Sequence, residues 1–150
     1  MDLAAASKDL TYHRDQIETE ADRTNDRHSL LRMTERKLHL VIKTAQHDAW
    51  HLPVITLEAE HGSLRGACEA LLQNTVDEST RTYTIGNCPS SVLPPLATAP
   101  NQTSFVMRAL LVSDQASFTN AVKDFAWVTA DELPEVLDAD VANQVQKITF

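Results

Sequence analysis

The sequence contains few cysteines and no long run of apolar residues. Cys68 and Cys88 are the two cysteines, and their spacing fits neither a metal knuckle nor a redox C-x-x-C motif. We expect both to be free thiols that pack as small hydrophobic side chains. No window approaches the roughly 18 consecutive apolar residues that a membrane-spanning helix needs. The sequence therefore predicts no disulfide framework and no membrane partner.

An excess of positive charge is also absent. The formal net charge of −8 argues against a protein that coats nucleic acid, because phosphate binding needs clustered Lys and Arg. The charge is uneven, since residues 23–43 carry six basic and two acidic residues, whereas residues 108–150 carry three basic and seven acidic ones. We expect the first region to be able to face RNA or an acidic partner and the second region not to.

The length and hydrophobic content fit one folded domain. A chain of 150 residues with 43% hydrophobic positions can bury one sizeable core. We predict an N-terminal extension with a lead-in helix over residues 1–36, the helix itself at 25–36, and one domain over residues 37–150. Residues 1–7 match neither a secretory signal nor an Arg-rich transit peptide.

Strands and helices are expected to alternate irregularly in that domain. Branched and aromatic residues predict extended segments at 37–43, 50–57, 83–85, 103–112 and 125–128, with a proline-bearing loop at 86–100. A helix capped by Ser63 and a last helix at 140–148 show apolar residues at helical spacing. A capping box at Thr129-Ala-Asp-Glu132 opens another helix. The predicted class is α/β (α+β), with a mixed sheet flanked by helices.

In this order of elements the chain resembles the Nudix superfamily. Nudix hydrolases carry the pattern G-x5-E-x7-R-E-U-x-E-E-x-G, whose helical carboxylates hold magnesium while water attacks a diphosphate. Acids three and four residues apart project from one face of a helix, and Mg²⁺ prefers such hard oxygen ligands. In the register that Ser63-Leu-Arg65 suggests, the positions needed for chemistry carry no acid. They fall on Gly62, Ala70, Leu71, Asn74 and Thr75.

A rival register places the motif's arginine on Arg65 and one of its paired acids on Glu69. It still leaves Gly66 and Ala70 where acids should stand. A single carboxylate with an apolar neighbour cannot hold and position the metal. We therefore predict that the chain is not an enzyme of the Nudix type and needs no cofactor.

A closer resemblance is to the mitochondrial large ribosomal subunit protein forty-six family, whose members have an inactive Nudix-like fold. The matching motifs run in order from residues 21–32 through the 38–42 strand to residues 127–133. Between them lie Trp50-His-Leu-Pro53, Ser63-Leu-Arg65, Ile85-Gly-Asn-Cys-Pro89 and Phe105-Val-Met-Arg-Ala109. The resemblance implies a structural protein of the central protuberance, bound to the ribosome in the mitochondrial matrix beside other large-subunit proteins.

Four arginines recur every four or five residues in the lead-in segment and could line one side of a helix, namely Arg23, Arg27, Arg32 and Arg36. Arg pairs bidentately with phosphate or carboxylate, so this side could bind a protein neighbour or make limited contact with rRNA. A solvated helix face with internal ion pairs is the alternative. We rank a protein partner ahead of RNA because the chain is acidic overall.

Two other functions stay open at this point. A divergent hydrolase of nucleoside diphosphate derivatives could draw ligands from Glu58, Glu60 or Glu69, and a binding module could keep the cleft without the chemistry. A zinc site at His47, His51 and His61 is disfavoured, because no cysteine or carboxylate stands at convincing ligand spacing.

Overall fold

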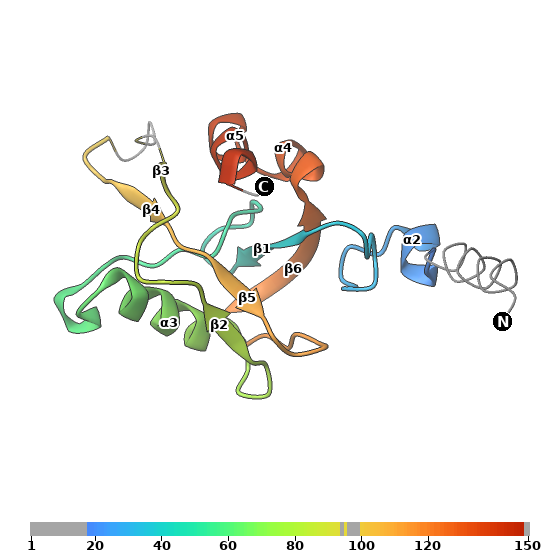
Figure 1. Cartoon of the computed structure of the whole chain (residues 1–150), viewed down its shortest axis with the longest axis horizontal. Coiled ribbons are helices and arrows are strands. Elements are labelled where there is room, and N and C mark those ends of the chain that lie inside the picture. The colour runs from blue at the N-terminus through green and yellow to red at the C-terminus, as the bar shows by residue number, and fades with distance from the viewer. Residues whose placement is uncertain (1–17, 94, 96–99, 149–150) are drawn as a thin grey trace, which may run out of the picture.

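The computed structural model of the chain describes residues 18–93, 95 and 100–148. Figure 1 shows short helices and strands mixed along the chain. In chain order the elements are α2 (Glu20–Thr24), β1 (Leu38–Thr44), η1 (Ala59–His61), α3 (Leu64–Thr75), β2 (Thr82–Thr84), β3 (Ser91–Leu93), β4 (Ser104–Val106), β5 (Ala109–Leu111), β6 (Val122–Thr129), η2 (Ala130–Glu132), α4 (Leu133–Val136) and α5 (Ala139–Ile148). The α+β class expected from the sequence is confirmed.

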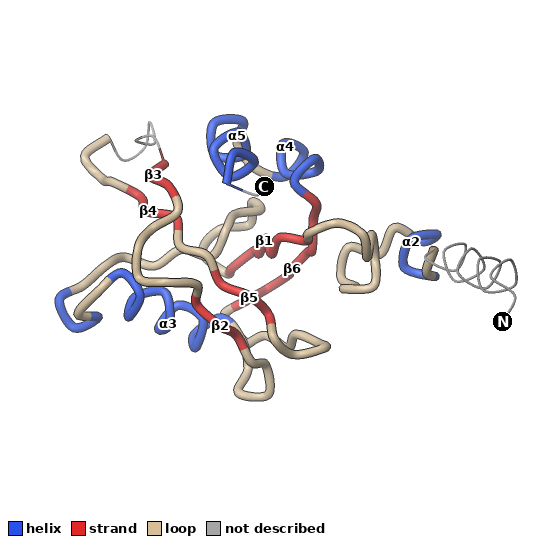
Figure 2. The backbone as a smooth tube through the Cα atoms, viewed as in Figure 1, coloured by secondary structure: helices blue, strands red, loops and turns tan. Residues whose placement is uncertain are grey.

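The strands pair in three antiparallel two-stranded sheets: β1 with β6, β2 with β5, and β3 with β4. Among the described residues they do not join into the single mixed sheet that we expected. The β1–β6 pair is the longest, running from Leu38 opposite Thr129 to Thr44 opposite Val122. Figure 2 shows this pair near the centre of the molecule, with β2 and β5 below it and β3 and β4 at the upper left.

The hydrophobic core lies between the β1–β6 sheet and the two C-terminal helices. Successive strand residues point to opposite faces, and Val41 and Ile42 are both buried, so both faces of β1 are covered. One face packs against α4 and α5, which lie beside the end of β6 in Figure 1. The core residues are Val41, Ala126, Val128, Leu133, Leu137, Ala142 and Val145.

Helix α3 begins as the sequence predicted. The Ser63 hydroxyl accepts a hydrogen bond from the Gly66 N–H at 3.0 Å, which satisfies one of the free donors at a helix start. A Cβ atom at Gly66 would collide with the carbonyl oxygen of His61. This position therefore requires glycine because the η1 turn comes so close to the helix. No helix in the described part of the chain is long and apolar enough to cross a membrane.

The predicted lead-in helix at residues 25–36 is wrong. The helix in this region is the earlier α2, and residues 25–36 form a series of turns. Asn25 and Met33 have left-handed backbone angles, with φ of 52° and 49°. A helix cannot continue through such residues. Side-chain contacts replace the helical bonds, as where the Asp22 carboxylate accepts the Met33 N–H at 2.6 Å.

The predicted long strand at 103–112 is divided. β4 pairs with β3 and β5 pairs with β2, so Met107 and Arg108 mark a change of partner strand. The predicted loop at 86–100 contains β3, and its residues 94 and 96–99 lie outside the described residues. Of the predicted segment 50–57, only His51 forms a bridge, with Ile42. Four other predicted elements are confirmed, and their ends differ from the predicted ends by a few residues at most. They are the strands at 37–43, 83–85 and 125–128 and the helix at 140–148.

Candidate functional site

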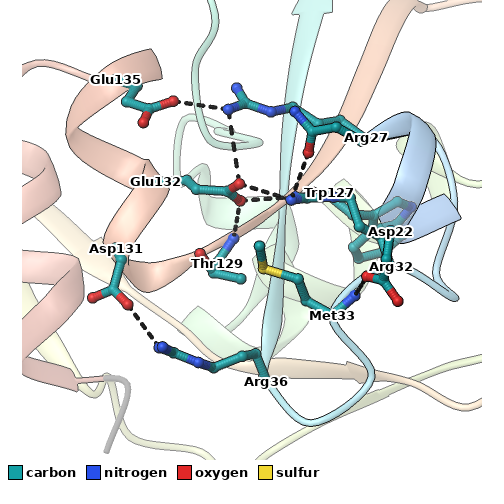
Figure 3. Close-up of polar contacts among 11 residues, drawn as sticks. Asp22, Arg27, Arg32, Met33, Arg36, Trp127, Thr129, Asp131, Glu132 and Glu135 are labelled. Carbon is teal, nitrogen blue, oxygen red and sulfur yellow. Dashed lines mark hydrogen bonds and ion pairs between the residues drawn. The ribbon is translucent and has the colours of Figure 1, made fainter. Parts of the chain in front are cut away.

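Three of the four arginines singled out in the sequence converge on the acidic residues that open α4. Arg27, Arg32 and Arg36 come from the turns before β1, whereas the acids come from η2 and α4, about 100 residues later. Figure 3 shows the three arginine side chains reaching across to the acids Glu135, Glu132 and Asp131 respectively. We call these three pairs the arginine–acid clamp.

The centre of the clamp is a buried, bidentate ion pair. The Arg32 side chain is 0% exposed and that of Glu132 is 13% exposed. Nη1 of Arg32 donates to Oε1 of Glu132, and Nη2 donates to Oε2, both at 2.7 Å. Nη2 also donates to the Trp127 carbonyl at 2.7 Å, and Nη1 donates to Oδ1 of Asn25 at 3.2 Å. A guanidinium forms such parallel bonds because its planar donors match a carboxylate.

These bonds shift the titration of Glu132. The pKa of Glu132 is lowered from 4.5 to about 2. The hydrogen bond from Arg32 is the largest cause, and the hydrogen bond from the Thr129 N–H, at 2.8 Å, also contributes. Burial acts in the opposite direction, because it penalises the charged form. The same hydrogen bond raises the pKa of Arg32. Glu132 is therefore ionised at neutral pH and keeps both its arginine and its helix-capping partner.

The two outer pairs are short but exposed. Nη2 of Arg27 lies 2.8 Å from Oε2 of Glu135, and Nη1 of Arg36 lies 2.6 Å from Oδ2 of Asp131. The Arg36 and Asp131 side chains are 61% and 72% exposed. Pairs in such surroundings contribute roughly 0–1 kcal/mol each. Most of the energetic consequence of the clamp is therefore expected at Arg32.

Backbone contacts extend the clamp along the outer edge of β6. The Trp127 N–H donates to the Arg27 carbonyl at 2.7 Å. Nε2 of His28 lies 3.0 Å from Oδ1 of Asp124, and its ring meets the Phe125 ring edge-on with centroids 5.0 Å apart. Together with the Arg32 bond to the Trp127 carbonyl, these contacts cover backbone groups at this edge of β6 that would otherwise be open to another strand.

Arg23 is separate from the clamp. Its Nη1 pairs with Glu20 one turn earlier in α2, at 3.4 Å, and both side chains are mostly exposed. The four arginines therefore do not line one helix face. Sequence reasoning noted the basic segment and the acidic C-terminal region, with opposite charges, but did not pair them with each other. That opposite charge was the signal that could have found the clamp.

The residues predicted to stand at Nudix motif positions lie on the other side of the sheet, at or just before α3. Leu71, Asn74 and Thr75 line a cavity of about 190 Å³, together with residues of β1 and β6 and the segment around His51. This volume is below the roughly 300–1,000 Å³ of small-molecule sites. Gly62 and Ala70 are not among its lining residues. The structure thus brings three of the five predicted positions together.

The cavity carries no acid. Its full lining is Ile42, Thr44, His51, Val54, Ile55, Leu71, Asn74, Thr75, Ala121 and Val122. The buried Thr75 hydroxyl donates to the Leu71 carbonyl at 2.7 Å, so it is engaged within the helix. Within residues 18–93, 95 and 100–148, no group of three His, Cys, Asp or Glu side chains is placed to hold a metal ion. Magnesium would find no carboxylate in this cavity.

The rival register is no better placed. Oε1 of Glu69 accepts from Nε of Arg65 at 2.9 Å on the exposed side of α3, which is an ordinary pair one helical turn apart. The other acids of that register fall on Gly66, where the His61 carbonyl leaves no room for a side chain, and on Ala70, which carries none. Glu69 is therefore the single carboxylate of that register on this helix.

The molecule described so far is a small α+β domain in which arginines pair with the acids at the start of α4 and no acid lines the α3 cavity. A search against protein-family models found no match. Among curated proteins, the chain is 30% identical over 132 residues to the large ribosomal subunit protein mL46 of Schizosaccharomyces pombe. It is 28% identical over 139 residues to the proteins of the same name from Rattus norvegicus and Mus musculus.

Each of these alignments covers 87% of this chain and 47–50% of the relative. The chain therefore spans about half the length of the curated relatives it matches. The similarities confirm the resemblance drawn from the sequence motifs and support placement of the chain in the mL46 family of mitochondrial large ribosomal subunit proteins. The alternative of a divergent Nudix hydrolase gains no support from them.

Proposed function

We propose that the chain is a non-enzymatic, structural constituent of the large subunit of the mitochondrial ribosome, bound to that particle in the matrix. The observation that carries this proposal is the similarity to mL46 proteins over 87% of the chain. The acid-free cavity on α3 supports the non-enzymatic part, because diphosphate hydrolysis of the Nudix type needs paired carboxylates to hold the metal.

Other large-subunit proteins of the central protuberance are the partners that we propose. The net charge of −8 favours protein neighbours over extensive contact with rRNA. Limited contact with rRNA through residues 18–36 stays a prediction. The internal partners of Arg27, Arg32 and Arg36 reduce the charge that this segment can offer to phosphate, which leaves Arg23 as its most exposed arginine.

We further propose that residues 18–36 belong to the same folding unit as the domain that follows. The domain boundary predicted from the sequence, between residues 36 and 37, would separate this segment from the domain. The Arg32–Glu132 pair and the backbone bond from Trp127 to Arg27 join this segment to β6 and η2, so its removal would leave a buried carboxylate without its partner.

Sedimentation tests the proposal. A tagged version of the chain, expressed from its own locus, should migrate with mitochondrial large subunits in a density gradient and should shift with them when the subunits are dissociated. A chain that stays in the light fractions while the large subunits migrate would contradict it.

The non-enzymatic part has its own assay, in which the purified chain and Glu69→Gln should release no phosphate from a panel of nucleoside diphosphate derivatives with Mg²⁺. Turnover by the wild type that Glu69→Gln abolishes would contradict that part alone.

A further inference from the structure

The β2–β5 sheet has one covered face and one bare face. Thr84 is buried on the side that faces α3, where its hydroxyl lies 3.9 Å from Sγ of Cys68. Tyr83 points to the opposite side because neighbouring strand residues alternate, and it is 56% exposed. Leu110 lies directly opposite Tyr83 in the pairing and is 54% exposed. Large apolar side chains therefore meet solvent at the centre of this face.

Val112 extends the same apolar face. Its N–H donates to the Arg81 carbonyl at 2.8 Å, which continues the β2–β5 pairing by one residue. Val112 follows Leu110 by two positions, so both side chains lie on one side of the strand, and Val112 is 55% exposed. A two-stranded sheet is only marginally stable by itself, which makes a bare apolar face on it a candidate for contact with a partner. We call Tyr83, Leu110 and Val112 the β2–β5 apolar face.

An acidic rim borders one end of this face. The loop before β2 carries Asp77 and Glu78, and the loop after β5 carries Asp114. Both loops emerge at the same end of the sheet, which is the lower end in Figure 2. The Arg81 N–H joins them by donating to Oγ of Ser113 at 2.6 Å. Unlike the acids of the clamp, these three form no ion pair among the described residues. The exposed Arg81, opposite Val112, is a base at the same end, so this end carries three acids and one base and keeps an excess of negative charge.

We infer that the β2–β5 apolar face docks a neighbouring protein of the large subunit whose contact surface is apolar at its centre and rich in Lys and Arg at its edge. This inference rests on the proposed ribosomal function. The acidic rim is complementary to such a partner and would repel the phosphates of rRNA.

Reconstitution tests the inference with the full chain. The probe is mitochondrial large subunits purified from cells depleted of this chain, to which wild-type or variant chain is added and co-sedimented. Leu110→Glu should weaken binding about tenfold, the effect of losing one well-placed apolar contact at an interface. The matched control is Leu57→Glu, a residue 50% exposed on a different segment, which should stay within about twofold of wild type. Equal binding by Leu110→Glu and wild type would overturn the inference.

Two further arms identify the partner. Glu78→Lys should weaken binding about threefold at low salt and have no effect at high salt, because exposed charges are screened there; a salt-independent or absent effect would overturn the electrostatic part. A photo-reactive benzoylphenylalanine at position 83 should cross-link to a basic ribosomal protein. Cross-links mainly to rRNA or to a second copy of the chain would overturn the choice of partner. Failure of the wild type itself to bind would instead contradict the proposed function.

Discussion

The start of α4 and the face of α3 use carboxylates in opposite ways. At η2 and α4, Asp131, Glu132 and Glu135 each have an arginine from the N-terminal segment. On α3, the positions that a Nudix hydrolase would fill with acids carry Leu71, Asn74 and Thr75, and the cavity beside them holds no acid. In the described part of the chain, the carboxylates at the start of α4 are thus paired with arginines, and none lines the α3 cavity.

The largest expected effect is the loss of the buried clamp arginine. Arg32→Ala leaves Glu132 mostly buried without its bidentate partner, so the free energy of unfolding should fall by about 3–5 kcal/mol. Urea denaturation of the purified chain measures it. The matched control is Arg36→Ala, since Arg36 forms an exposed pair in the same clamp and should lose roughly 0–1 kcal/mol.

A double variant separates the charge from the packing. Arg32→Met with Glu132→Leu removes both buried charges, and it should be clearly more stable than Arg32→Ala, because a buried ion pair contributes little over a hydrophobic replacement. Equal losses for Arg32→Ala and Arg36→Ala would contradict the description of the clamp as one buried pair flanked by two exposed ones.

The next largest effect is expected at acid pH, which should weaken the ion pair between Arg32 and Glu132. The folded-state pKa of Glu132, about 2, lies below the ordinary value of 4.5. A carboxyl group whose pKa is lower in the folded state than in the unfolded state stabilises the fold. This stabilisation is complete at pH values above the unfolded-state pKa, and it is lost as the pH falls through the folded-state pKa. The contribution is on the order of 3 kcal/mol, and it should disappear between pH 4.5 and about 2.

The comparison with Glu132→Gln isolates this effect from the other carboxyls, since Asp22, Asp48 and Asp124 also have lowered pKa values. The difference in unfolding free energy between wild type and Glu132→Gln should be constant at neutral pH and shrink towards zero in the acid range. A difference that does not change with pH would show that Glu132 does not carry the shift.

Introducing acids into α3 should lower the free energy of unfolding by a smaller amount that depends on the position. Thr75 is buried, so Thr75→Glu places a carboxylate in the cavity without a partner and should cost about 2 kcal/mol. Asn74→Glu, one residue earlier at an exposed position, should be nearly neutral. Thermal unfolding with and without Mg²⁺ measures both. Strong stabilisation of Thr75→Glu by Mg²⁺ would mean that the cavity still suits a metal ion.

The smallest effect is expected at the exposed ion pair between Lys123 and Asp48. Nζ of Lys123 lies 2.6 Å from Oδ1 of Asp48, and both side chains are well exposed. Lys123→Ala should leave the free energy of unfolding close to that of the wild type, and any small difference should vanish at high salt. A larger loss would mean that exposed pairs matter more here than the contrast with Arg32 implies.

Local sequence patterns predicted the elements that local interactions determine. The Ser63 cap, the strand of branched residues at β1 and the capping contact of Glu132 with Thr129 were all predicted, because each depends on neighbours within a few residues. The assignment of Leu71, Asn74 and Thr75 to Nudix positions rests on motif spacing and stays a prediction.

The errors lie where distant contacts decide the local structure. Residues 25–36 were expected to be helical, but Arg32 bonds to Glu132 and Asp22 accepts the Met33 N–H, so turns replace the helix. The division between β4 and β5 depends on which strand lies alongside each one, and no local pattern in residues 104–111 encodes that. The clamp joins residues about 100 positions apart, so only its charges were apparent in the sequence.

A density map of mitochondrial large subunits from the organism that makes this chain would test the central claim most directly. The proposal predicts density for the chain within the particle, with Arg32 bonded to Glu132 and with a protein neighbour, not rRNA, against Tyr83, Leu110 and Val112. A complete large subunit that contains no density for the chain would contradict the structural role proposed here.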